Sequence, residues 1–72
     1  MNSTVYVYNR DRKPVKHKRV AISISGGGMA DGVTDDSGCA TISHSSESTA
    51  KVYVNGTEVG RFHAPGSTEV TV

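Results

Sequence analysis

The chain has 72 residues and a formal net charge of +1, and its hydrophobic residues (35%) include no Leu and no Trp. It contains instead 10 Val, 3 Ile and 7 Thr, whose branched side chains fit a pleated sheet better than a helix. This composition argues against a helical bundle, a disordered chain and a membrane-spanning helix. We expect one domain over residues 1–72, too small to enclose a deep substrate cleft.

The first predicted strand covers residues 4–8, where valines alternate with tyrosines. This period of two predicts a half-buried strand with the valines toward the core and with Tyr6 and Tyr8 outward. A long polar connection over residues 9–19 follows, in which Pro14 has no amide hydrogen to donate to a neighbouring strand. The chain is therefore expected to open with one strand and one extended connection.

Three further strands are expected before residue 44. The second covers residues 19–25 and ends at three glycines, which predict a flexible loop. The third is short, over residues 31–34, and a tight turn over residues 35–38 separates it from the fourth, over residues 39–43. The side chains expected to point inward from these strands include Val20, Ile22, Ile24, Ala40 and Ile42.

A hairpin over residues 49–62 is the strongest local prediction, with its turn at Asn55 and Gly56. A type I′ turn needs a positive φ at both central residues, and Asn-Gly is the pair that adopts it most readily. A Pro-Gly turn then leads to the last predicted strand, over residues 68–72. The side chains expected inward from this half of the chain include Val52, Val54, Val70 and Val72.

The register of this hairpin requires an irregularity. Pairing across the turn sets Val52 opposite Val59, and simple alternation from there puts Phe62 on the outer face. We therefore predict a bulge at Gly60, which returns Phe62 to the core side.

Seven short strands separated by turn signals predict an all-β fold. We expect a small antiparallel two-sheet β-sandwich of the prealbumin-like or Ig-like kind. A partly open barrel of the oligonucleotide-binding type is the alternative.

Four short segments carry a resemblance to a known group. They are a strand at residues 5–7, Lys-Pro-Val at 13–15, a second strand at 20–22, and Thr-Asp-Asp-Ser-Gly at 34–38. In this order they resemble the carboxypeptidase regulatory-like and transthyretin-like modules, which are prealbumin-like β-sandwiches. The resemblance implies a fold and a module that is usually non-catalytic, often attached to enzymes, surface proteins or secretion machinery.

Two special properties within this group are not expected. The transthyretin-like hydrolases end in Tyr-Arg-Gly-Ser, whereas this chain ends in Val-Thr-Val. Similar pilin-type modules carry a Lys–Asn isopeptide cross-link with the Asn on the last strand, where this chain has none.

Charge is distributed unevenly along the chain. Residues 1–19 hold six cations and one anion, whereas residues 20–72 hold two cations and six anions. Clustered cations attract anionic partners, and outward tyrosines can stack on bases or sugars, so this pattern predicts a site for an anionic polymer or carbohydrate. The candidate residues are Tyr6, Tyr8, Arg10, Arg12, Lys13, Lys16, Lys18 and Arg19.

A plainer interpretation of the same residues is favoured. The cations then belong to a solvated connection that faces the acidic remainder of the domain or of a neighbouring copy. The two tyrosines then pair across strands or belong to a self-association patch.

No motif for catalysis, metal binding or cofactor binding is present. The three His and the single Cys match no metal spacing, no Ser has the context of a nucleophile elbow, and the glycine run lacks a phosphate-loop Lys. Cys39, expected outward, favours a reducing compartment such as the cytoplasm, and no signal peptide is visible. We expect a non-catalytic structural or protein-interaction module, not an enzyme, whose partner is another protein or its own copy; nucleic acid or another polyanion is the less favoured partner.

Overall fold

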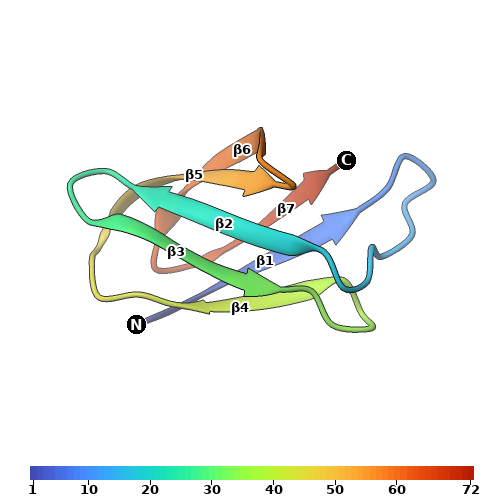
Figure 1. Ribbon diagram of the computed structural model, residues 1–72, viewed down its shortest axis with the longest axis horizontal. Coiled ribbons are helices and arrows are strands. Elements are labelled where there is room, and N and C mark those ends of the chain that lie inside the picture. The colour runs from blue at the N-terminus through green and yellow to red at the C-terminus, as the bar shows by residue number, and fades with distance from the viewer.

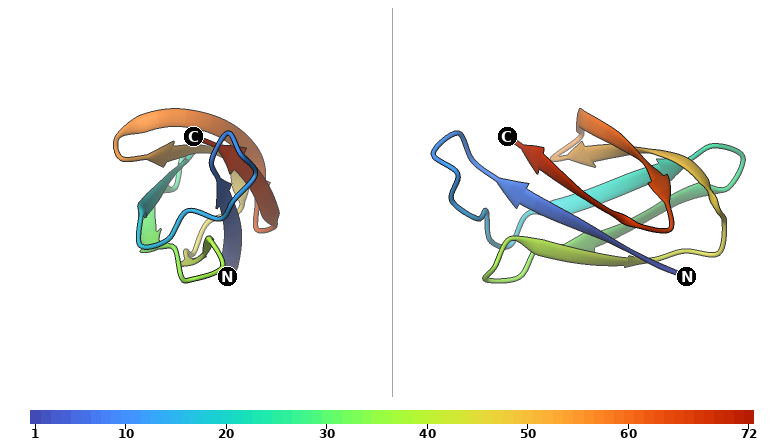
Figure 2. Two further views of the ribbon diagram at one scale, coloured as in Figure 1. Left: turned by 90° about the vertical axis from the view of Figure 1, so that its right-hand side faces the viewer. Right: turned by 180° about the vertical axis from the view of Figure 1, so that it is seen from behind.

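Two β-sheets packed face to face form the computed structural model, which describes residues 1–72 (Figure 1). The strands are β1 (Asn2–Tyr8), β2 (Arg19–Ile24), β3 (Gly28–Val33), β4 (Cys39–Ser43), β5 (Ser48–Val54), β6 (Thr57–Ala64) and β7 (Ser67–Thr71). One sheet has the order β4-β1-β7 and the other the order β3-β2-β5-β6. Figure 2 shows the two layers end-on in its left view. The all-β two-sheet sandwich predicted from the sequence is confirmed.

The core between the sheets consists of small and branched aliphatic side chains from alternate strand positions. It contains Val5, Val7, Val20, Ile22, Ile24, Ala40, Ile42, Ala50, Val52, Val54, Ala64 and Val70. Full burial of a Val or Ile side chain contributes about 1.5–3 kcal/mol, so this set supplies most of the driving force for folding. The predicted inward aliphatic positions are buried except Val72, which is 42% exposed because it lies beyond the end of β7. Phe62, also predicted on the core side, is partly buried against the core.

One strand pairing corrects the predicted purely antiparallel arrangement. β1 and β7 run parallel, with Val7 beside Val70, whereas every other pair of strands is antiparallel. Parallel neighbours need a long crossover connection, and here residues 9–66 provide it. The first and last strands of the chain therefore lie side by side, as Figure 2 shows in its right view.

Strand boundaries agree with the prediction to within two residues except at β3. The third strand is present, but its predicted bounds of 31–34 are wrong, because the strand covers Gly28–Val33 and pairs with the whole of β2. Gly and Asp disfavour strands, so the sequence does not indicate the pairing that β2 imposes. The glycine run is thus the tip of a hairpin, and its third glycine already lies opposite Ile24.

The Asn-Gly turn of the second hairpin is confirmed. Asn55 and Gly56 have φ values of 53° and 82°, and Val54 pairs with Thr57 across them. These positive values are what a type I′ turn requires.

The predicted bulge in β6 is present, but one residue earlier than expected. Val52 pairs with Gly60, so the predicted pairing of Val52 with Val59 is wrong and Val59 is the extra residue. The consequence for Phe62 is nevertheless as predicted, because it pairs with Ala50 and packs against the core. The bulge therefore sets which β6 side chains face outward.

Candidate binding surfaces

The basic segment, residues 10–19, begins after β1 stops and ends at Arg19, the first residue of β2 (Figure 1). Its first part is a defined turn: the Asn9 side-chain oxygen accepts hydrogen bonds from the amides of Asp11 (2.9 Å) and Lys13 (3.0 Å). All six of its Arg and Lys residues are exposed. The turn therefore holds the beginning of the segment in a fixed shape while the charged groups remain in solvent.

Most cations of the basic segment have no acidic partner. Arg19 pairs with Asp31 at 2.6 Å, and His17 lies 3.3 Å from Asp36. The other five Arg and Lys residues have no carboxylate within 4 Å. Of these cations, Arg19 is therefore the one that pairs with the acidic remainder of the domain. An exposed ion pair of this kind contributes at most about 1 kcal/mol to the stability of the fold.

Tyr6 and Tyr8 lie half-buried on the outer face of the three-stranded sheet. Tyr8 forms an isolated bridge with Pro14, so it lies beside the basic segment. The neighbours of Tyr6 across the sheet are Cys39 and Glu69, so an acidic side chain flanks it. The structure therefore brings one of the two tyrosines beside the basic segment.

A Ser–His contact that the sequence does not indicate ties the start of β1 to the loop after β4. The Ser3 hydroxyl lies 2.6 Å from His44 Nε2, and His44 Nδ1 donates to the carbonyl of Ser46 at 2.8 Å. This resembles the hydrogen bond of a nucleophile to its base, but Ser3 is fully buried and no substrate can reach its oxygen. The contact holds the two segments together.

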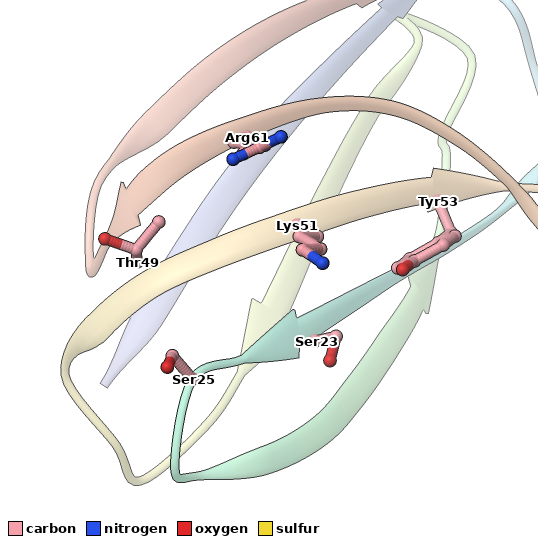
Figure 3. A pocket seen from close by; sticks show the side chains of 6 residues that line it. All are labelled: Ser23, Ser25, Thr49, Lys51, Tyr53 and Arg61. Atoms are coloured by element: carbon pink, nitrogen blue, oxygen red, sulfur yellow. The ribbon is translucent and has the colours of Figure 1, made fainter.

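The outer face of the four-stranded sheet carries a shallow hollow of about 300 Å³ that sequence reasoning missed (Figure 3). Strands β2, β5 and β6 and the residue that follows β2 contribute its lining, which consists of Ser23, Ser25, Thr49, Lys51, Tyr53 and Arg61. Lys51 and Arg61 are ten positions apart in the chain, so neither belongs to a charge run. Strand alternation in the sequence indicates that Lys51 faces outward. Which residues lie beside it on the neighbouring strands is known only once the strand register is known.

The same face also carries exposed apolar side chains at its β3 edge. Met29 and Val33 on β3 are 68% and 60% exposed, and Ala21 of β2 lies in the adjoining row. The Arg19–Asp31 ion pair lies on the same strands. This set of five residues, here called the β3 patch, is neutral overall and has both apolar and charged members.

Metal-binding groups are not gathered anywhere on the chain. No three His, Cys, Asp or Glu side chains lie close enough together to hold an ion, and Cys39 is a free, half-buried thiol. The fold also contains no apolar helix long enough to cross a bilayer.

Comparison of the chain with models of protein families, with curated proteins and with solved structures finds no significant match.

Proposed function

We propose that this domain is a non-catalytic structural or protein-interaction module. The observation that supports this proposal is the β3 patch, where two large apolar side chains on the edge strand of the four-stranded sheet are more than half exposed. Exposed apolar side chains gathered on one face of a small domain mark interaction surfaces more often than scattered single ones do.

The partner that best fits the β3 patch is a second copy of the chain. The patch contains one cation and one anion side by side, Arg19 and Asp31, flanked by apolar groups. A two-fold axis through the patch sets the cation of each copy against the anion of the other and brings the apolar side chains together. Two short strands bury less than the standard interface of about 1,600 Å², so a weak dimer is expected.

Sedimentation equilibrium from about 20 μM to about 1 mM protein tests this partner. We expect the weight-average mass to rise with concentration. Met29→Lys should weaken association about tenfold or more, because it places two extra cations at the contact. Thr71→Lys is the matched control, since it adds the same charge at an exposed position on the other sheet. A wild-type chain that stays monomeric over this range would contradict the proposal.

We also infer a relation to the carboxypeptidase regulatory-like and transthyretin-like modules. The turn at residues 34–38 supports it: Asp35 accepts hydrogen bonds from the amides of Ser37 and Cys39, and Gly38 has a φ of 76°. Thr34 is buried and its hydroxyl accepts a hydrogen bond from the amide of Lys18 at 2.8 Å. Longer chains that join this module to enzymes, surface proteins or secretion components would support the relation, and their absence among close homologues would count against it.

A second candidate function is the binding of an anionic polymer or carbohydrate by the basic segment. The five exposed cations without a carboxylate partner favour it. Heparin chromatography provides the test, with elution expected above about 0.2 M salt. Arg12→Gln should lower the salt needed for elution more than Arg19→Gln, because Arg19 is already paired. Elution of the wild type below that salt concentration would rule this function out.

A further inference from the structure

We propose that the hollow on the outer face of the four-stranded sheet binds a small hydroxylated ligand that carries one oxyanion, such as a sugar bearing a phosphate, sulfate or carboxylate group. This site is separate from the basic segment and does not depend on self-association through the β3 patch. Five observations support it: a pair of cations, a set of free hydroxyl groups, a tyrosine ring, the size of the hollow and the position of a neighbouring carboxylate.

Two cations stand directly opposite each other in the hollow. Lys51 of β5 and Arg61 of β6 are register partners, so the fold brings their like charges together. Like charges opposite each other destabilise a sheet, and neither side chain has a carboxylate within 4 Å. An oxyanion bound between them would accept charge-assisted hydrogen bonds from both and relieve the repulsion.

The remaining lining groups suit the hydroxyls of a sugar. Ser23, Ser25 and Thr49 lie beside the cations, and none of these side chains forms a hydrogen bond within the chain. Figure 3 shows Lys51 between Arg61 and Ser23, with Tyr53 at one end of the hollow. The donors and acceptors of this surface therefore remain free for a ligand.

Tyr53 supplies the flat surface that a ring needs. Tyr53 is half-buried on β5, so part of it remains in solvent and open to a ligand. A phenol offers both an apolar ring surface and a hydroxyl group, a combination that suits a ligand with apolar and polar faces. Because all six lining residues project from or adjoin paired strands, the backbone positions that carry the site are set by the sheet itself.

The size of the hollow and the charge beside it suit one small unit with a single anionic group. A volume of about 300 Å³ lies at the lower end of the range for small-molecule sites, which is about 300–1,000 Å³. Glu58 stands opposite Tyr53 in the next row of the sheet and is exposed. A polymer with further anionic groups extending past Tyr53 would be repelled by this carboxylate.

Titration followed by ¹H–¹⁵N NMR tests the site with glucose 6-phosphate as the probe. We expect saturable shifts with a Kd on the order of 1 mM, confined to amides of residues 23–25, 49–53 and 60–62. Glucose tests the ring without the anion and inorganic phosphate tests the anion without the ring; each should bind at least about tenfold more weakly. Glucose 6-sulfate and glucuronate then identify which oxyanion the pair of cations prefers.

Two variants of equal net charge distinguish binding in the hollow from general attraction of the anionic ligand to a positively charged chain. Lys51→Gln should weaken binding of glucose 6-phosphate about tenfold, whereas Thr71→Glu, which lowers the net charge by the same one unit at an exposed position on the other sheet, should leave it unchanged. Dispersed spectra of both variants establish that they fold. Shifts centred on residues 10–19, equal effects of the two variants, or no saturable binding would overturn the proposal. Equal affinity for inorganic phosphate would overturn the sugar part of it.

Discussion

Gly38 is the residue at which backbone conformation and close packing act together. It has a φ of 76°, and a Cβ at this position would lie 2.7 Å from the carbonyl oxygen of Val7 and 2.8 Å from the Pro14 Cβ. The turn after β3 therefore presses against both β1 and the basic segment. Only a residue without a side chain allows this contact.

Gly38→Ala is expected to destabilise the domain by more than the cost of left-handed backbone alone, which is about 1–2 kcal/mol. Gly56→Ala is the matched control, because Gly56 has a φ of 82° and a Cβ added there would meet no atom within 4 Å. Urea unfolding of both variants measures the difference. Equal losses of stability would show that the packing around Gly38 contributes nothing.

At the scale of one element, the bulge in β6 allows an eight-residue strand to pair with the seven-residue β5. Val59 has no partner in the register, and the residues on either side of it keep the alternation that puts Phe62 inward and Arg61 outward. The bulge therefore determines that Arg61 lies opposite Lys51 in the hollow on the outer face of the four-stranded sheet.

Deletion of Val59 should leave a folded domain, since every existing pair between β5 and β6 remains possible without it. The loss is expected to be about 1–2 kcal/mol, because Val59 packs only partly against the core. Deletion of Ser23 in the central strand β2 is the comparison and should abolish folding, since it moves the following side chains to the wrong face. Thermal unfolding by circular dichroism and NMR dispersion measure both results, and an unfolded Val59 deletion would contradict this account.

For the whole molecule, closure of the sandwich depends on the parallel pair of β1 and β7. β7 brings Val70 into the core, and Gly60 of β6 lies close enough that a Cβ there would be 3.3 Å from the Val70 side chain. The last strand thereby links the two sheets at one side. A domain of this size has little stability in reserve, so the loss of one strand is expected to affect all of it.

Removal of residues 67–72 should abolish cooperative unfolding, because β1 would lose a neighbour and the core would open beside Val70. Removal of Val72 alone should cost only about 0.5–1.5 kcal/mol, for the one hydrogen bond from its amide to the Tyr8 carbonyl. Urea unfolding, monitored by circular dichroism, distinguishes the two truncations. A cooperative transition in the longer truncation would show that six strands suffice.

The sequence by itself determined the local features of this protein. Alternation of branched aliphatics predicted the strands, and Asn-Gly predicted the hairpin turn, because both depend on neighbouring residues and on backbone preferences. The tertiary structure alone decided the extent of β3, the parallel pairing of β1 with β7 and the meeting of Lys51 with Arg61. Each of these depends on residues distant in the chain, whose pairing follows from closing a common core and not from any local pattern.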